Sequence, residues 1–377
     1  MATATGAGQT RLALPDFPWD SLVPYAATAR SVHGGIVDLS VGTPVDPTPE
    51  VVRRALAAAA DAPGYPQTYG TPELRQAVAD WFARRRGVPE VDPAGVLPTI
   101  GSKELVAWLP TLLGLGPGDS VVLPRVAYPT YRVGALLAGA TPVASDGLAG
   151  LGPARAQLVW VNSPANPTGK VLGVGHLRKV VEWARQRGAV VASDECYAEL
   201  AWEGEHAASG VVPSILDPRV CGGSHEGLLA VYSLSKQSSM AGYRAAFVAG
   251  DPALVRRLLE VRKHAGMMVP APVQAAMTAA LGDDDHVREQ RARYERRRGV
   301  LLPALRSAGL RVDESEAGLY LWATREEDCW TTVGELAERG ILVAPGAFYG
   351  EAGRRHVRVA LTATDERVGV AADRLAR

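Results

Sequence analysis

Val231-Tyr-Ser-Leu-Ser-Lys-Gln-Ser-Ser-Met-Ala-Gly-Tyr-Arg244 is the stretch on which the interpretation of this sequence depends. An apolar run from Leu228 to Tyr232 predicts a buried strand, which gives way to small hydroxyl residues around Lys236. Lysine is scarce here, with five lysines among 40 basic residues. A lysine packed among Ser, Leu and Met at a strand end can be desolvated, which lowers its pKa and frees its amine as a nucleophile. The alternative is a strand-end lysine with its head group in water.

Length and composition predict a globular protein of about two domains. The chain has 377 residues, of which 47% are hydrophobic and 21% charged. Its 40 basic and 40 acidic residues balance, so charge does not indicate nucleic acid or a membrane surface as a partner. Three widely spaced cysteines suggest a reducing compartment, and the histidines lack metal-site spacing, so no metal is expected.

No apolar run approaches the roughly 18–20 residues of a membrane span. The first ten residues lack the cationic start and apolar segment of a signal peptide. We therefore expect a soluble cytoplasmic protein with a disordered tail at residues 1–14.

Short apolar strands alternate with helices through most of the chain, which predicts an α/β fold with a mainly parallel sheet flanked by helices. Strands are expected at 36–39, 120–123, 158–162, 190–194, 228–232 and 245–249, and helices at 22–30, 51–60, 71–86, 101–113, 128–137, 174–187 and 252–263. After residue 270 a long charged helix at 287–308 precedes strands at 310–312, 318–323 and 356–361, which suits a smaller α+β domain. We expect residues 15–45 to form an N-terminal arm and part of the small domain, 46–270 the large domain, and 271–377 the C-terminal small domain.

Polar motifs follow several of these strands, at the edge where open α/β sheets bind ligands. Asn162-Ser-Pro-Ala-Asn-Pro-Thr-Gly169, Asp194-Glu-Cys-Tyr197 and Lys236 each end a strand, and Gly101-Ser102-Lys103 opens a helix whose free N–H groups favour a phosphate. Each motif alone has an ordinary explanation: a turn, a helix N-cap, a solvated lysine, a simple helix start, or, for Arg244, a surface ion pair. Their joint occurrence in this order indicates a ligand site.

With these motifs the sequence resembles the fold type I, class I/II pyridoxal-phosphate aminotransferases, from about residue 15 to the C-terminus. The resemblance rests on Asn-Pro-Thr-Gly at 166–169, Asp-x-x-Tyr at 194–197, Ser-x-x-Lys followed eight residues later by Arg at 233–244, and the arginine of His356-Val-Arg-Val-Ala360. It implies a large domain that binds pyridoxal 5'-phosphate, a smaller α+β domain, and a homodimer with shared active sites.

Within this family the sequence is similar to the actinobacterial N-succinyldiaminopimelate aminotransferases of lysine biosynthesis. The similar stretches are FPWDSL (17–22), GIVDLSVGTPVDPTP (35–49), SLSKQSSMAGYR (233–244), RKHAGMMVPAPVQAAM (262–277) and ALTATDER (360–367).

The resemblance implies how four residues act on the reacting part of the cofactor. Lys236 forms the covalent link to it and, once the substrate has displaced it, moves the proton at the substrate Cα. Asp194 pairs with the pyridine nitrogen and keeps it protonated. Asn166 and Tyr197 hydrogen-bond the ring's phenolic oxygen, which stabilises its anionic form.

The resemblance also implies a phosphate site built from Ser233, Arg244 and the backbone amides of Ser102 and Lys103. Tyr128 matches the position whose aromatic ring stacks on the cofactor. Its alternative is a core aromatic residue in a Tyr-Pro turn.

For the substrate, Arg358 corresponds to the arginine that grips the α-carboxylate, with Asn166 beside it and Gly42 in the loop that closes over it. Tyr65 matches a tyrosine that the family donates to the neighbouring subunit's phosphate. Donors for distal carboxylates are suggested only by residue type, and surface roles are the alternative for each. These candidates are Arg30, Arg132, Lys263 and His264.

The resulting hypothesis is transamination between glutamate/2-oxoglutarate and N-succinyl-LL-2,6-diaminopimelate/N-succinyl-2-amino-6-oxopimelate. A broader aspartate or aromatic aminotransferase, or a C–S lyase on the same fold, shares the cofactor residues. A non-enzymatic regulator that senses the cofactor would need a DNA-binding module, for which the segment before Pro15 is too short.

Overall fold

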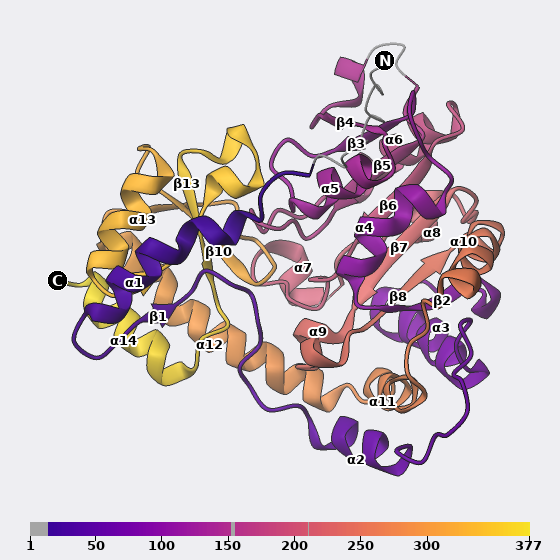
Figure 1. Ribbon diagram of the computed structural model, residues 1–377, viewed down its shortest axis with the longest axis horizontal. Coiled ribbons are helices and arrows are strands. Elements are labelled where there is room, and N and C mark those ends of the chain that lie inside the picture. The colour runs from indigo at the N-terminus through magenta and orange to yellow at the C-terminus, as the bar shows by residue number, and fades with distance from the viewer. Residues whose placement is uncertain (1–13, 152–154, 210) are drawn as a thin grey trace, which may run out of the picture.

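The computed structural model describes residues 14–151, 155–209 and 211–377, which form two lobes (Figure 1). The larger lobe is built on a seven-stranded sheet in the order β2-β8-β7-β6-β5-β3-β4. Its strands are β2 (Val96–Ile100), β3 (Ser120–Leu123), β4 (Thr141–Ala144), β5 (Leu158–Asn162), β6 (Val190–Asp194), β7 (Leu228–Ser233) and β8 (Ala245–Gly250). β8 runs antiparallel to both of its neighbours, β2 and β7, and the other neighbouring pairs are parallel.

Helices cover both faces of this sheet because its central strands are apolar on both sides. Along β7, Leu228, Ala230 and Tyr232 face one core, whereas Leu229 and Val231 face the other. The first core is closed by α3 (Pro72–Arg86), α6 (Val174–Arg185), α8 (Pro218–Cys221) and α11 (Ala271–Leu281), and α2 (Glu50–Ala58) packs on α11. The second is closed by α4 (Ser102–Leu112), α5 (Thr130–Leu137) and α10 (Pro252–Ala265).

The smaller lobe holds a four-stranded antiparallel sheet in the order β12-β13-β10-β9 and a parallel pair, β1 with β11. The strands are β1 (Val37–Asp38), β9 (Arg311–Asp313), β10 (Tyr320–Thr324), β11 (Ile341–Leu342), β12 (Ala344–Pro345) and β13 (His356–Ala360). The helices are α1 (Val23–Ser31), α12 (Asp285–Ser307), α13 (Cys329–Glu338) and α14 (Asp365–Leu375). Leu22 and Leu39 of the N-terminal arm share one core with Leu305 and Leu336, so both ends of the chain build this lobe (Figure 1).

Short elements complete the described chain. They are the helices α7 (Gly204–Ser209) and α9 (Leu234–Gln237), and the 3-10 helices η1 (Pro18–Leu22), η2 (Pro93–Gly95), η3 (Leu148–Leu151), η4 (Ala241–Tyr243), η5 (Gly346–Tyr349) and η6 (Glu351–Gly353). No helix in the described part of the chain is long and apolar enough to cross a membrane.

This architecture is the fold that the sequence predicted, a mostly parallel sheet between helices plus a smaller α+β lobe. The ranges predicted for β3, β5 and β6 match the observed ones, and the Thr71 hydroxyl caps α3 by accepting the Leu74 N–H at 3.2 Å. The strands β2 and β4 were not predicted from the sequence. Both lie at the edges of the sheet and contain a proline, which an edge strand tolerates but which obscures a strand pattern.

The predicted boundary at residue 270 would assign α11 to the small domain. In the structure α11 packs against α2 and α3, and its Val273, Met277 and Leu281 belong to a core under the large sheet. The long helix α12 places Tyr294 and Leu301 in the core of the small lobe. We therefore propose that the change of domain falls in α12.

Candidate active site

Three adjacent parallel strands end in polar residues at one edge of the large sheet. Asn162 ends β5, Asp194 ends β6 and Ser233 ends β7. The loop carrying Gly42 and the small-lobe strands β10 and β13 approach the same edge, because Arg358 bonds to Asn166 and Lys236 bonds to Gly42. The candidate site therefore lies between the two lobes.

Asp194 is a buried carboxylate held by neutral donors. Its Oδ2 accepts a hydrogen bond from the Tyr131 hydroxyl at 2.8 Å, and its Oδ1 accepts one from the Cys196 backbone N–H at 3.2 Å. Burial raises the pKa of Asp194, and these hydrogen bonds oppose that shift. No lysine or arginine of the described residues forms an ion pair with it, so the position suits a cationic group of a ligand.

Lys236 is enclosed rather than solvated, which answers the question its sequence context left open. It lies on α9, which Ser233 caps, and its Nζ donates a hydrogen bond to the Gly42 carbonyl. Burial lowers the pKa of Lys236, while the nearby Tyr320 and Cys196 act in the opposite direction. The Tyr294 hydroxyl bonds the Lys236 carbonyl at 3.2 Å and fixes the backbone there. The Lys236 amine is therefore held in place by its hydrogen bond, and its protonated form is less favoured than in water.

A positively charged cradle forms where α4 begins. Gly101 is the N-cap of α4 with φ +76°, and no side chain caps the helix. A Cβ at Gly101 would overlap Nη2 of Arg244, so only glycine allows the guanidinium to lie against this turn. Burial, and then the charge of Arg244, lower the pKa of Lys103. Two cations beside free N–H groups make an anion site.

Ser233 and Tyr128 flank this region. The Ser233 hydroxyl lies 2.8 Å from that of Ser235 and accepts the Ser235 N–H at 3.1 Å. The Tyr128 ring meets Tyr131 edge-on at 5.9 Å, and burial raises the pKa of Tyr128 to about 12. Tyr128 therefore stays a neutral aromatic surface beside the carboxylate of Asp194.

Arg358 reaches the site from β13. It is 3% exposed, and it donates from Nη1 to Asn166 Oδ1 at 3.0 Å and from Nη2 to the Ser40 carbonyl at 2.6 Å. Its Nε is buried and has no hydrogen-bond partner among the described residues. A buried cation with an unused donor suits a carboxylate ligand.

Tyr197 and Tyr320 form a pair of phenols across the two lobes. Their hydroxyls are 3.1 Å apart and their rings meet nearly edge-on at 5.6 Å. Arg358 Cζ lies 3.9 Å from the centroid of the Tyr320 ring. Tyr197 was predicted from the sequence, whereas Tyr320 and Tyr131 were not. Tyr131 follows Tyr128 by three residues in the turn that leads into α5, where its N–H donates to the Tyr128 carbonyl at 3.2 Å, whereas nothing local marks Tyr320.

Some candidates lie elsewhere. Tyr65 is 95% exposed in the loop between α2 and α3 and so contacts little of its own chain. Lys263 forms an exposed ion pair with Glu260 at 2.9 Å, and Arg30 and Arg132 are exposed on α1 and α5. The exposure of these three basic residues agrees with the alternative given for them, a role on the surface instead of in the site.

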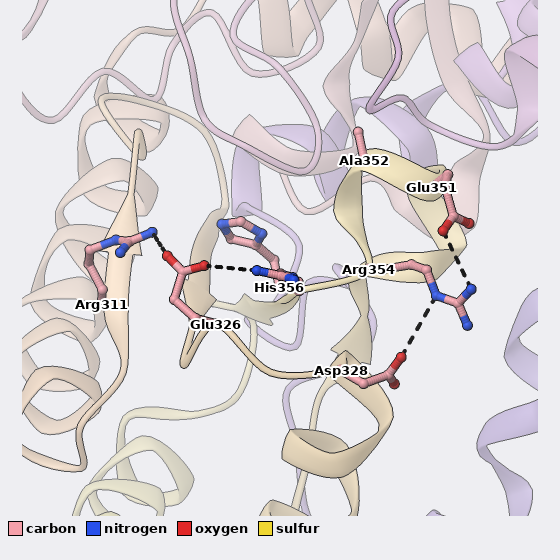
Figure 2. Close-up of a pocket in the computed structure, with 8 residues that line it drawn as sticks. Arg311, Glu326, Asp328, Glu351, Ala352, Arg354 and His356 are labelled. Carbon is pink, nitrogen blue, oxygen red and sulfur yellow. Dashed lines mark hydrogen bonds and ion pairs between the residues drawn. The ribbon is translucent and has the colours of Figure 1, made fainter.

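A hollow in the small lobe also gathers charges, but these charges pair with one another (Figure 2). It is lined by Arg311, Glu326, Asp328, Glu351, Ala352, Arg354, Arg355 and His356. Arg311 pairs with Glu326 at 2.6 Å, and Arg354 pairs with Glu351 at 3.4 Å and with Asp328 at 3.7 Å. This hollow is distinct from the site between the lobes.

Comparison with known proteins identifies the family. The family described as aminotransferase class I and II matches residues 35–375. The chain belongs to this family. Its members use pyridoxal 5'-phosphate, and this chain is an aminotransferase with that cofactor.

Similar proteins span almost the whole chain. The probable aminotransferase Rv1178 of Mycobacterium tuberculosis is 61% identical over 375 residues, covering 100% of this chain and 88% of that protein. The 4-dedimethylamino-4-oxo-anhydrotetracycline transaminase OxyQ of Streptomyces rimosus is 60% identical, covering 96% of this chain and 99% of its own. The solved structure of a probable N-succinyldiaminopimelate aminotransferase from Thermus thermophilus superposes with a TM-score of 0.83 at 31% identity, covering 96% and 99%.

The residues present fit the cofactor. The cradle at Gly101, Lys103 and Arg244 suits a phosphate, because a Cβ at Gly101 would close it and its cations have no carboxylate partner among the described residues. The buried Asp194, held only by neutral donors, suits the nitrogen of a pyridinium ring.

Proposed function

We propose that this aminotransferase acts on an α-amino acid with a distal carboxylate, with N-succinyl-LL-2,6-diaminopimelate and glutamate as the first pair to test. The observation that carries the proposal is the unpartnered, buried Nε of Arg358, which calls for an anionic group inside the site. An α-carboxylate supplies that group, and Arg358 would then orient the neighbouring Cα toward Lys236.

If Arg244 and the backbone amides of Ser102 and Lys103 hold the phosphate, the amine of Lys103 is left for a second carboxylate on the substrate. This amine lies 5.2 Å from the centre of the Phe17 ring, and no carboxylate of the described residues pairs with it. The similarity to the probable N-succinyldiaminopimelate aminotransferase of Thermus thermophilus is consistent with such a substrate.

We propose the residue roles that the family resemblance implies, and the surroundings of Lys236, Asp194 and Arg358 support them. When bound, pyridoxal 5'-phosphate supplies a carbonyl carbon for the amino group and a ring that withdraws electrons from Cα. Lys236, with its lowered pKa, takes the proton from the substrate Cα and returns it. Asp194 would hold a proton at the ring nitrogen, and Tyr197 and Asn166 would donate hydrogen bonds to the ring oxygen. Ser233, Arg244 and the amides of Ser102 and Lys103 would hold the phosphate.

We further propose a homodimer in which Tyr65 serves the partner's site. The support is its 95% exposure, since a tyrosine so placed has little function within its own chain. Tyr65→Phe in a mixed dimer with Lys236→Ala would test this. Subunit sharing predicts that the two defects complement, because one site of the mixed dimer then contains both an intact Lys236 and an intact Tyr65. If Tyr65 acted within its own chain, neither site would be intact and the defects would not complement.

A second candidate is amination of a ketone that carries no α-carboxylate. It is favoured by the 60% identity to OxyQ, whose name specifies a 4-oxo-anhydrotetracycline substrate. In that case the Nε of Arg358 would bond a carbonyl or enol oxygen instead of a carboxylate.

The two candidates are separated by half-reactions of the purified holoenzyme. We expect N-succinyl-LL-diaminopimelate alone to convert the bound cofactor stoichiometrically to its amino form, reversibly with 2-oxoglutarate, as measured by visible absorbance. Conversion only by aspartate would keep the distal carboxylate but replace the substrate. Conversion only by an aromatic amino acid would keep the role of Arg358 and overturn the distal carboxylate. If no amino acid with a distal acid converts the cofactor, and if enzyme loaded with the amino form of the cofactor transfers its amino group to a polycyclic ketone and returns to the aldehyde form, the second candidate is favoured.

A further inference from the structure

Tyr320 is a residue of the site that comes from the small lobe. It begins β10 and is 5% exposed. Its ring lies against the Arg358 guanidinium, with Cζ 3.9 Å from the ring centroid, and its hydroxyl lies 3.1 Å from that of Tyr197. Tyr197 follows β6 in the large lobe, so this hydroxyl pair is a direct polar link between the lobes at the site.

The position of the Tyr320 hydroxyl is constrained on its other side by the backbone of Gly42. A Cβ at residue 42 would overlap this hydroxyl. The Gly42 carbonyl in turn accepts the hydrogen bond of the Lys236 amine. The hydroxyl of Tyr320 is therefore confined between Tyr197 and the loop that holds Lys236, and a side chain without it would leave Tyr197 without this partner.

Either phenol could donate in the hydrogen bond between Tyr320 and Tyr197, and the electrostatics favour Tyr320. Burial alone would raise the pKa of Tyr320, but the nearby cations of Arg358 and Lys236 and the bond to Tyr197 lower it below its usual value. Burial and the neighbouring Tyr320 raise the pKa of Tyr197. The more acidic O–H is the better donor, which favours donation from Tyr320 to the Tyr197 oxygen. The proton of Tyr197 then remains available to an acceptor in the site.

We propose that Tyr320 is a positioning residue that turns the hydroxyl of Tyr197 toward the ring oxygen of the bound cofactor and strengthens it as a donor. Successive hydrogen bonds polarise one another, so the Tyr197 hydroxyl donates more strongly when its own oxygen accepts a bond. This inference rests on the proposed role of Tyr197. The competing explanation is that Tyr320 serves only as an aromatic surface for Arg358.

The test is the pH midpoint of the visible absorbance of the bound cofactor, measured on holoenzyme without substrate. Donation by Tyr197 stabilises the anionic ring oxygen, so the proton bound beside this oxygen on the cofactor is released at lower pH. A weaker donor therefore moves the midpoint to higher pH. We expect Tyr197→Phe to raise the midpoint by about one unit, and Tyr320→Phe to raise it by about 0.3 unit. Tyr320→Phe keeps the ring on Arg358, so a purely aromatic role predicts no shift.

The double variant Tyr197→Phe/Tyr320→Phe tests whether Tyr320 acts through Tyr197. We expect its midpoint to equal that of Tyr197→Phe, because no phenol remains for Tyr320 to orient. The matched control is Tyr232→Phe, which removes another buried phenol, bonded to Gln237 at 2.5 Å on the far face of β7, and should not move the midpoint. Melting of each apoprotein checks that all variants fold.

The outcomes separate the two proposals. A shift in Tyr197→Phe without one in Tyr320→Phe overturns the role of Tyr320 alone. No shift in either variant overturns both it and the proposed role of Tyr197. Additive shifts in the double variant overturn the inference that Tyr320 acts through Tyr197, and equal midpoints support it.

Discussion

Two charged regions of this protein differ in how their charges are compensated. Between the lobes, Asp194, Lys236 and Arg358 are desolvated, and none forms an ion pair with the described residues. In the hollow of the small lobe, Arg311 and Arg354 are 59% and 51% exposed and pair with neighbouring carboxylates (Figure 2). Uncompensated buried charge costs stability unless a ligand compensates it, whereas exposed pairs contribute little. The comparison therefore assigns binding to the first region and predicts that the second is dispensable for activity.

The largest effect is expected for Lys236→Ala. Loss of the amine removes both the link to the cofactor and the group that moves the Cα proton, so turnover should fall by at least about 10³-fold. The visible absorbance of the bound cofactor should change as well. The apoprotein should melt no lower than wild type, because an unpaired buried amine is removed. Lys263→Ala, at an exposed lysine, is the control and should keep full activity. Normal turnover in Lys236→Ala would sink the site assignment.

Arg358→Lys should have the next largest effect. It keeps the charge but loses the fork that bonds Asn166 and Ser40 while presenting Nε. We expect KM for the amino acid to rise about 10- to 100-fold, as for loss of a charged hydrogen bond of about 1.5–3 kcal/mol. Arg354→Lys in the small-lobe hollow is the matched control. Equal KM values in the two variants would remove the distinction between the regions.

A small effect is expected for Arg354→Ala. This arginine is half exposed and pairs with Glu351 and Asp328 at 3.4 and 3.7 Å. The free energy of unfolding, measured with urea, should change by less than about 1 kcal/mol, and less again at high salt. Steady-state kinetics should be unchanged. A specific loss of turnover in this variant would give the hollow a function that its paired charges do not suggest.

The smallest effect concerns Asp313, beside the same hollow. Its hydrogen bond with Arg311, opposed by burial and aided by His356, lowers the pKa of Asp313 to about 2. A carboxylate with a depressed folded-state pKa stabilises the protein above its unfolded pKa of about 3.9, and this is lost as pH falls toward 2. Asp313→Asn should therefore lower Tm slightly at pH 7, with the difference from wild type shrinking below about pH 4. Exposure limits the effect to under about 1 kcal/mol. A difference in Tm between Asp313→Asn and wild type that does not depend on pH would contradict this explanation.

Local signals in the sequence were sufficient for much of the fold. The ends of β5 and β6 were predicted because apolar runs stop at Asn162 and Asp194, and the start of α3 because Thr71 precedes a proline and an acid. The edge strands β2 and β4 were not predicted, because each contains a proline that only an edge position accommodates. Whether a strand lies at an edge depends on its neighbours, which no single segment specifies.

The candidate site divides in the same way. The sequence by itself determined the identity and order of Asn166, Asp194, Lys236 and Arg244, because the ends of parallel strands carry their own polar residues to one edge of the sheet. Only the tertiary structure decided which residues surround them. Tyr131 meets Asp194 across 63 positions, Tyr320 meets Tyr197 across 123, and Arg358 meets Ser40 across 318. Such partners are set by how the lobes pack, and packing depends on the whole chain at once.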